Sequence, residues 1–197
     1  MRKQIAVLAS GAGTVLQAVI DGCADGRLAA DVCLVISNNS RSGAAQRAEG
    51  HGIPFRHLSA QTHADPDMLD TAVVDALVQH RTDIVFLAGY MKKLGPRTLS
   101  HFRGRILNTH PALLPKFGGL GMYGSRVHAA VLAAAERVTG VSVHRVEGDY
   151  DSGPILAQCE VPVLPGDDVE SLSARVQTRE RIFVVETLAR IARGELA

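Results

Sequence analysis

Three polar side chains that could carry out chemistry at a carbonyl group stand in two separated stretches of this 197-residue chain. Asn108 and His110 lie two residues apart, directly after an apolar run, and Asp151 follows much later. An amide donor, an imidazole and a carboxylate suffice to stabilise an oxyanion and to move a proton. Because Pro111 disfavours helical backbone angles for His110, we expect the imidazole at the end of a strand.

Each of these residues also has an ordinary structural explanation. A histidine beside a proline is commonly a surface residue, or a buried one with satisfied hydrogen bonds. Residues 148–153 have the composition of a turn, in which an aspartate caps its own backbone. Asp149 lies in the same turn, so an exchange of roles between Asp149 and Asp151 stays open at this point.

Short apolar segments alternate with helical patterns in the first half of the chain. Runs rich in Val, Ile and Leu predict buried strands, and apolar residues spaced three and four apart predict helices. The predicted strands are 5–9, 32–36, 84–88 and 106–107, and the predicted helices are 14–23, 42–50 and 67–80. This alternation indicates an α/β fold with a Rossmann-like, mainly parallel central sheet and helices on both faces.

The pattern changes after residue 140. Val141, Val143 and Val146, and then residues 155–163, predict strands separated by a turn too short for a crossover helix, so this part of the sheet is expected to be antiparallel. Residues 169–193 predict a long amphipathic helix that closes the chain. Its expected core-facing residues are Leu172, Val176, Ile182, Val185, Leu188 and Ile191.

Length and composition narrow the class of protein. A single domain spanning 1–197 is expected, because a chain of this size can bury one substantial core. Lys and Arg number 21 and Asp and Glu number 20, without a basic stripe that would mark a nucleic-acid partner. Three scattered cysteines predict neither disulfides nor a zinc site and fit a reducing cytoplasm. No apolar stretch is long enough to predict a membrane span.

Small residues at positions 10–14, hereafter the glycine loop, join the first predicted strand to the first predicted helix. Backbone N–H groups at the start of a helix attract anions, so a phosphate could bind there. A dinucleotide fingerprint would require glycine in place of Leu16 and an acidic residue at the end of the second strand, and both are missing. The glycines are equally typical of a tight turn that binds nothing.

The pattern Asn-x-His-Pro-Ala-Leu-Leu-Pro at 108–115, followed by Asp-x-Gly-Pro at 151–154, resembles the active-site motif of the folate-dependent formyltransferases. The likeness runs from the first strand to the last helix. Within the family, the chain is similar to members that act on glycinamide ribonucleotide in purine biosynthesis. The resemblance implies that the amine of this ribonucleotide attacks the formyl carbon of the co-substrate 10-formyltetrahydrofolate, with no metal required.

The resemblance implies a role for each polar residue. Asn108 would donate a hydrogen bond to the developing oxyanion, and His110 would donate a hydrogen bond or a proton. Asp151 would favour the imidazolium form and order a water that carries protons. Asp151, rather than Asp149, matches the family pattern, because it stands in the correct spacing before Gly153 and Pro154.

The family binds the phosphate of the ribonucleotide at the glycine loop, which implies a phosphate site at Gly13, Thr14 and Val15. Val15 replaces the usual Asn, so that binding there is expected to rely on backbone N–H groups and the Thr14 hydroxyl. Near the end of the chain, Glu180 matches a family glutamate that contacts the nucleotide. A solvent-facing position on the helix is the alternative for Glu180.

Residues 89–94 match the family's folate segment, which implies that Met91, Lys92, Lys93 and Leu94 bind folate together with Asn108. The expected pterin contacts are the main-chain groups of Lys92 and Leu94, while Met91 and Leu94 supply an apolar wall. Without the resemblance, this segment is typical of a solvated loop with two lysines. The glycine-dense residues 116–124 depart from many relatives, and we expect them to form a mobile loop that can cover substrate.

Other functions use the same polar residues. A 10-formyltetrahydrofolate hydrolase would replace the amine by water, and other formyltransferases act on an amino sugar or aminoacyl-tRNA. A nucleotide-binding protein without catalysis would keep the glycine loop but would not need the three polar residues. The glycine loop favours the phosphoribosyl substrate. The expected partners are therefore small molecules, with neither nucleic acid nor membrane, and the chain is expected to be a monomer or a homodimer.

Overall fold

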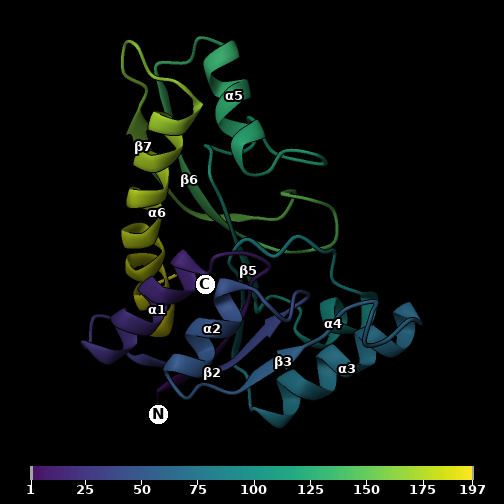
Figure 1. Ribbon diagram of the computed structural model, residues 1–197. Coiled ribbons are helices and arrows are strands. Elements are labelled where there is room, and N and C mark those ends of the chain that lie inside the picture. Colours follow the sequence, from purple (N-terminus) through teal and green to yellow (C-terminus); the bar gives the residue numbers. More distant parts are fainter. Residues whose placement is uncertain (1, 197) are drawn as a thin grey trace.

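A computed structural model describes residues 2–196, whose strands form one seven-stranded sheet in the order β3-β2-β1-β4-β5-β6-β7. The strands are β1 (Lys3–Leu8), β2 (Ala30–Ser37), β3 (Phe55–His57), β4 (Ile84–Leu87), β5 (Ile106–His110), β6 (Val138–Arg145) and β7 (Ile155–Pro162). Strands β1 to β5 are parallel, whereas β6 and β7 each run antiparallel to the strand before them. Figure 1 shows β6 and β7 extending away from the parallel part.

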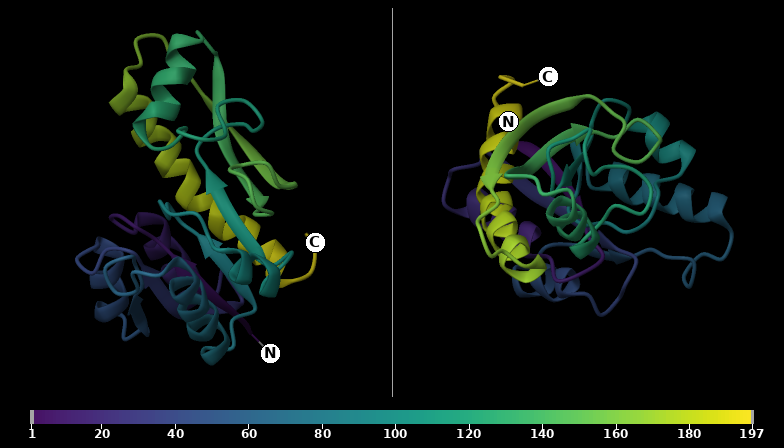
Figure 2. Two further views of the ribbon diagram at one scale, coloured as in Figure 1. Left: turned by 90° about the vertical axis from the view of Figure 1, so that its right-hand side faces the viewer. Right: turned by 90° about the horizontal axis from the view of Figure 1, so that it is seen from above.

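Six helices accompany the sheet. They are α1 (Thr14–Ala24), α2 (Gly43–Gly50), α3 (Pro66–Gln79), α4 (Pro96–His101), α5 (Ser125–Ala133) and α6 (Val169–Ala192). Helix α6 contacts both α1 and α5, and in Figures 1 and 2 it runs alongside the antiparallel strands from one region of the molecule to the other. It therefore connects the parallel and antiparallel parts of the fold.

The parallel strands are buried on both faces. Along β1, Ile5 and Val7 pack into one hydrophobic cluster, whereas Ala6 and Leu8 pack into a second cluster on the opposite face. Such alternation follows from the two-residue period of a strand. Helices α1, α2, α5 and α6 contribute to the first cluster, and α3 and α4 contribute to the second. The predicted α/β fold, with helices on both faces of a mainly parallel sheet, is confirmed.

Side-chain caps fix where several helices begin. Ser42 accepts a hydrogen bond from the Ala45 N–H at the start of α2, and Asp65 caps α3 just before Pro66. At α6, Asp168 and Ser171 form a capping box. These side chains satisfy backbone N–H groups that have no partner within the helix. The predicted helices 14–23, 42–50, 67–80 and 169–193 accordingly match α1, α2, α3 and α6 closely.

The antiparallel extension agrees with the prediction for residues after 140. β6 and β7 pair from Val138 opposite Pro162 to His144 opposite Ile155, and the residues between them form a turn without a helix. Gly153 ends this turn beneath the Arg145 carbonyl oxygen, where a side chain would collide with backbone. Glycine is thus required for the close approach that brings the turn back over β6.

Some features were missed or predicted wrongly. Strand β3 and helices α4 and α5 were not predicted. With three and six residues, β3 and α4 are too short to give a clear periodic pattern. Ile182 was predicted to face the core, but its residue is 48% exposed. The buried stripe of α6 instead includes Phe183 and Val184 beside it, so Ile182 faces outward.

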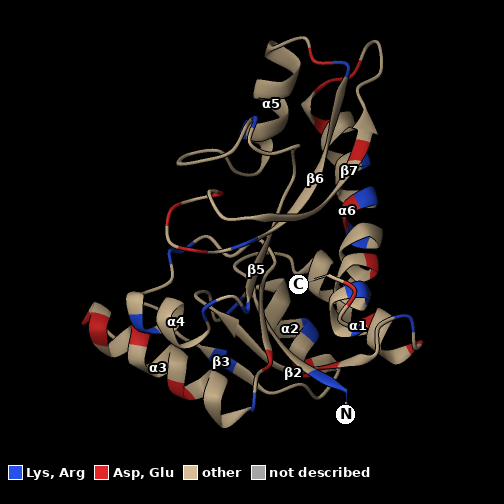
Figure 3. Cartoon of the chain, turned by 180° about the vertical axis from the view of Figure 1, so that it is seen from behind, with Lys and Arg blue, Asp and Glu red and all other residues tan. Residues whose placement is uncertain are grey.

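Charged residues of both signs are distributed over the described chain, and α6 carries both (Figure 3). Among residues 2–196, no helix combines the length and apolar character needed to cross a membrane.

Candidate active site

The carboxyl ends of β1, β4 and β5 meet at one edge of the sheet, because these strands are parallel and adjacent. From β1 the chain builds β2 and β3 on one side of β1, and it then crosses back to place β4 on the opposite side of β1. The strand order therefore reverses between β1 and β4, which is the topological switch point of the sheet. Open α/β sheets bind ligands in the crevice at such a point. With neighbouring strands about 4.8 Å apart, the ends of β1 and β5 are separated by roughly 10 Å.

Strand β5 orients the first two predicted polar residues. Asn108 and His110 point to the same face because strand residues alternate, and Thr109 points to the other. His110 is the last residue of β5, as the following proline predicts. Asp151, from the turn between β6 and β7, comes within 3.4 Å of both Asn108 Nδ2 and His110 Nδ1. We call Asn108, His110 and Asp151 the polar triad.

The His110 side chain is only 5% exposed, and both ring nitrogens face protein oxygens. Its Nε2 lies 2.7 Å from the carbonyl oxygen of Phe117, which can only accept a hydrogen bond, so Nε2 carries the proton. Nδ1 is then the basic nitrogen of the neutral ring, and it faces Asp151 Oδ2 at 3.4 Å. Burial lowers the pKa of His110 below 6.5, and this effect outweighs the nearby Asp151 charge, which raises it.

The Asp151 charge favours the imidazolium form, in the direction expected from the sequence, but burial opposes it. The carboxylate does stabilise a proton on the ring, but removing the imidazole from water costs more than the carboxylate returns. His110 is therefore neutral at neutral pH, with Nδ1 ready to accept a proton and Asp151 placed to stabilise the imidazolium that results.

The Asp151 carboxylate is held by partners on several sides. The Gly119 N–H donates a hydrogen bond to Oδ2 at 2.9 Å, and His144 Nε2 lies 3.4 Å from Oδ1. Burial raises the pKa of Asp151, but the neighbouring His110 ring and the Gly119 N–H oppose this, and the pKa stays below 3.8. The carboxylate is therefore ionised at neutral pH. Its backbone has a φ of 54°, a left-handed conformation that is uncommon for a residue with a side chain.

His144 belongs to the site although it was not predicted. On β6 it lies opposite Asn108 in the strand register, and its side chain is 2% exposed. His144 Nδ1 lies 2.8 Å from the Arg145 carbonyl oxygen, so Nδ1 carries the proton and Nε2 accepts from Asn108 Nδ2 at 3.1 Å. A sequence signal existed, because Ser142 and His144 alternate with valines in a strand whose two faces are both buried.

The glycine loop makes a tight turn into the start of α1. Gly13 precedes α1 with a φ of 70°, and a Cβ atom there would lie 2.9 Å from Ala44 Cα, so glycine is required. Thr14 is the exposed first residue of α1. Val15 is only 8% exposed, and its side chain packs into the core. The group that Val15 can offer to a ligand at the helix start is therefore its backbone N–H.

Residues 89–94, hereafter the 89–94 loop, follow β4 between the glycine loop and the polar triad. Met91, Lys92 and Lys93 are exposed. Leu94 packs its side chain into the hydrophobic cluster beside α3 and α4. Lys93 reaches across to the turn that carries Asp151, because its Nζ lies 3.4 Å from Asp149 Oδ1. Asp149 is thus at the surface, away from the imidazole.

Glu180 is buried, which rules out the solvent-facing alternative. Thr109, on the opposite face of β5 from the polar triad, donates a hydrogen bond to Glu180 Oε1 at 3.0 Å. Burial raises the pKa of Glu180, and the Thr109 hydrogen bond opposes this rise.

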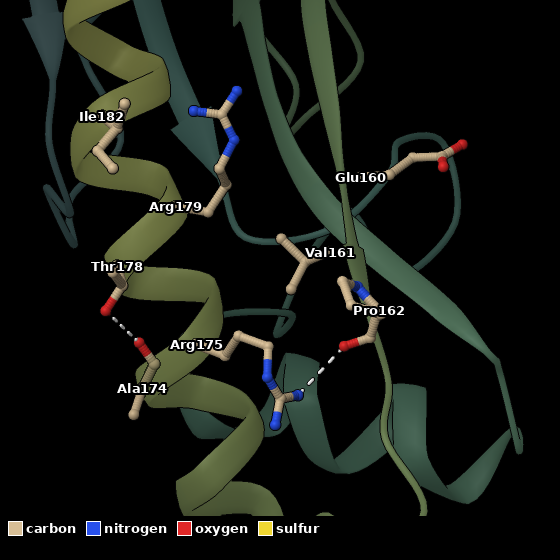
Figure 4. Close-up of a pocket in the computed structure, with 8 residues that line it drawn as sticks. All are labelled: Glu160, Val161, Pro162, Ala174, Arg175, Thr178, Arg179 and Ile182. Carbon is tan, nitrogen blue, oxygen red and sulfur yellow. Dashed lines mark hydrogen bonds between the residues drawn. The ribbon is translucent and has the colours of Figure 1, made fainter.

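A separate hollow of about 530 Å³ lies between β7 and α6 (Figure 4). Its walls include Val161, Pro162 and the outward-facing Ile182, and it contains none of the predicted site residues. Within residues 2–196, no three His, Cys, Asp or Glu side chains are grouped so that they could hold a metal ion.

Comparisons with known proteins place the chain in a family. The formyl transferase family model matches residues 3–188. The chloroplastic phosphoribosylglycinamide formyltransferase of Arabidopsis thaliana is 40% identical over 96% of this chain, which spans 65% of that relative's length. The Escherichia coli phosphoribosylglycinamide formyltransferase is 36% identical, with 98% of this chain and 88% of the relative covered.

A solved structure gives the same result in three dimensions. Glycinamide ribonucleotide transformylase 1 from Symbiobacterium toebii superimposes with a TM-score of 0.92 at 37% identity, and the match covers all of this chain and 90% of the other. The family model covers more than half of the chain, and the fold agrees with it. This chain belongs to the formyl transferase family.

Proposed function

We propose that this protein transfers the formyl group of 10-formyltetrahydrofolate to the amine of glycinamide ribonucleotide, a reaction of purine biosynthesis. The observation that carries the proposal is the convergence of the polar triad, from two distant stretches of the chain, at the sheet edge that also holds the glycine loop. The relatives named above bear the names of enzymes with this activity.

In the proposed reaction, the neutral amine nitrogen attacks the formyl carbon and a new C–N bond forms. The carbonyl electrons move to oxygen, which gives a tetrahedral intermediate with an oxyanion. The bond from the formyl carbon to N10 of the folate then breaks, and the carbonyl re-forms. One proton leaves the amine and one proton is gained by the departing nitrogen, so a group that accepts and returns a proton balances the reaction.

His110 is proposed to be that group. Its Nδ1 is unprotonated in the neutral ring and can accept the proton lost by the amine, directly or through a water. The imidazolium formed is stabilised by the ionised Asp151 carboxylate 3.4 Å away and can then protonate the leaving nitrogen. Phe117 fixes the ring tautomer through its carbonyl oxygen, which keeps the basic nitrogen pointing toward Asp151.

Asn108 is proposed to donate a hydrogen bond to the oxyanion. Its two Nδ2 hydrogens face His144 Nε2 at 3.1 Å and Asp151 Oδ1 at 3.4 Å. The longer contact is the weaker of the two, so exchanging it for the substrate oxygen costs less. His144 then acts as a positioning residue that holds the Asn108 amide in place.

The remaining predicted residues are proposed to bind the two substrates. Backbone N–H groups of Gly13, Thr14 and Val15 would hold the ribonucleotide phosphate at the start of α1, and the Thr14 hydroxyl would add a hydrogen bond. Glu180 would accept a hydrogen bond from a hydroxyl of the nucleotide. A phosphate here distinguishes this substrate from an amino sugar that lacks one.

The folate is proposed to bind along the 89–94 loop. Main-chain groups of Lys92 and Leu94 would contact the pterin, with Met91, Lys93 and Asn108 completing the contacts. The buried Leu94 side chain anchors the loop to the core, so its backbone presents a fixed edge to the ligand. 10-formyltetrahydrofolate is therefore proposed as the formyl donor.

The test is an assay of purified protein with 10-formyltetrahydrofolate and one acceptor at a time: glycinamide ribonucleotide, unphosphorylated glycinamide riboside, or water alone. Release of tetrahydrofolate should require the ribonucleotide and should be stoichiometric with formylated product. Inorganic phosphate should compete with the ribonucleotide and not with the folate. Equal folate release without an amine would instead identify a hydrolase, and absence of any release would reject the proposal.

A further inference from the structure

Ser10 lies between the end of β1 and the glycines of the glycine loop, and its hydroxyl is bonded on two sides. The Met91 N–H donates a hydrogen bond to Ser10 Oγ at 2.8 Å. The hydroxyl proton is in turn donated to Asn38 Oδ1, directly after β2. The Ser10 N–H also donates to the Gly89 carbonyl oxygen at 3.2 Å. One residue therefore connects three loops that follow three adjacent strands.

These bonds cross the topological switch point of the sheet. β1 is hydrogen-bonded to β2 on one side and to β4 on the other, but beyond the strand ends the sheet ladder stops. Ser10 continues the connection past that point, from the glycine loop to the 89–94 loop. No other side-chain hydrogen bond within residues 2–196 joins residues 10–14 to the 89–94 loop.

We propose that Ser10 is a positioning residue that couples the two substrate sites, so that binding of the ribonucleotide at the glycine loop strengthens binding of folate at the 89–94 loop. This inference rests on the proposed function, because it takes the two loops to be the phosphate and folate sites. Ser10 itself contacts neither reacting group. Its effect is transmitted through the Met91 backbone and the Asn38 side chain.

The physical basis is shared ordering of two loops. Asn38 and the end of β1 hold the Ser10 hydroxyl in one position, and that hydroxyl holds the Met91 N–H. An anion bound to the N–H groups beyond Ser10 restricts the glycine loop, and the restriction passes to Met91 through a single hydrogen bond. A folate that binds afterwards then loses less conformational entropy, which is positive coupling between the sites.

Coupling of this kind is measured by calorimetry. The Kd of tetrahydrofolate is determined for the wild type with and without saturating glycinamide ribonucleotide. The wild type should bind tetrahydrofolate about fivefold or more tightly when the ribonucleotide is present, the lower end of typical coupling between sites. In Ser10→Ala the ratio should fall toward one, because the Met91 N–H loses its acceptor.

Ser171→Ala is the matched control. Like Ser10, Ser171 has a hydroxyl that is bonded on two sides. It accepts a hydrogen bond from the Asp168 backbone N–H at 3.0 Å and donates one to the Asp167 side-chain oxygen Oδ1 at 2.9 Å. It lies at the start of α6, far along the chain from both loops. A general loss of stability would affect both variants, whereas loss of coupling should occur only in Ser10→Ala.

A measurement on the wild type tests the same inference without any variant. Hydrogen exchange of the Met91 amide should slow when glycinamide ribonucleotide alone is added, because the glycine loop then holds Ser10 more firmly. Unchanged exchange at Met91, or an undiminished Kd ratio in folded Ser10→Ala, overturns the coupling while leaving the proposed function intact. A wild type that binds neither substrate overturns the proposed function and the coupling with it.

Discussion

The glycine loop and the polar triad lie at the same sheet edge, yet they are built in different ways. The glycine loop is continuous in sequence, follows a regular strand and presents backbone N–H groups of residues 13–15. The polar triad joins residues 43 apart in sequence, at Asn108 and Asp151, and depends on side chains that are largely buried. The first site therefore depends on backbone shape, and the second depends on the identity of each side chain.

This difference predicts that the two sites should tolerate sequence change differently. At position 15 the valine side chain enters the core and the backbone N–H remains at the helix start, so the side chain itself should matter little to an anion there. No equivalent freedom exists at His110, whose two nitrogens have separate partners and separate roles. Substitutions in the triad should therefore affect the chemical step, whereas substitutions in the loop should affect ribonucleotide binding.

The largest effect is expected for His110→Ala. Removing the proposed proton acceptor should lower kcat by about 10²–10⁴-fold, the usual contribution of general acid–base catalysis. Ribonucleotide KM should change little, because the glycine loop is untouched. Steady-state kinetics with both substrates checks this split, and circular dichroism verifies that the variant is folded. A variant that kept kcat but lost ribonucleotide affinity would reverse the assignment of the two sites.

Gly13→Ala should mainly raise the KM for the ribonucleotide. A left-handed backbone costs an alanine about 1–2 kcal/mol, which corresponds to roughly 5- to 30-fold in affinity if the loop must keep its shape. The Cβ would also press on Ala44. Gly11→Ala is the control, because a Cβ at Gly11 would meet no atom within 4 Å. Similar KM values for the two variants would contradict the backbone-shape account.

Titration of His110 tests the electrostatics of the triad. Because burial lowers its pKa, NMR of the imidazole should give a midpoint below 6.5, and Asp151→Asn should lower it further by removing the charge that raises it. The folded-state pKa lies below the unfolded value, so the stability contributed by neutral His110 is complete above 6.5 and is lost as pH falls through the folded pKa. A midpoint above 6.5 would show that Asp151 outweighs burial.

The smallest functional effect is expected for Val15→Ala. The truncation should lower the free energy of unfolding by about 1–3 kcal/mol, because a buried side chain is shortened. Ribonucleotide KM should stay within about twofold, since the backbone N–H groups at the helix start remain. Thermal unfolding and initial rates measure the two quantities separately. A large rise in KM at unchanged stability would mean that the Val15 side chain contacts the ligand.

The sequence predicted the parts of the fold that have strong local patterns. Long helices and buried strands, the antiparallel turn and the position of His110 at a strand end follow from periodicity and from Pro111. The short elements β3 and α4 did not, because tertiary packing rather than local pattern stabilises them. Ile182 was misplaced for a related reason, since a helical period alone does not show which neighbour covers each face.

The site was predicted in its motif residues and missed where contacts come from other elements. His144 enters through strand register, and the Phe117 carbonyl and Gly119 N–H enter through loop conformation. The two backbone groups give no signal in the side-chain sequence, whereas His144 could have been noticed from its alternation with valines in a buried strand. The neutral state of His110 was also unpredicted, because the balance between burial and the Asp151 charge depends on three-dimensional packing.

The most direct test compares Asp151→Asn with Asp149→Asn in formyl transfer from 10-formyltetrahydrofolate to glycinamide ribonucleotide. Both changes remove one carboxylate from the same turn, but only Asp151 lies against His110, while the Asp149 side chain is 90% exposed. Asp151→Asn should reduce kcat by at least about a hundredfold, and Asp149→Asn should remain within about twofold of the wild type. Equal activity in the two variants would contradict the proposed role of the polar triad.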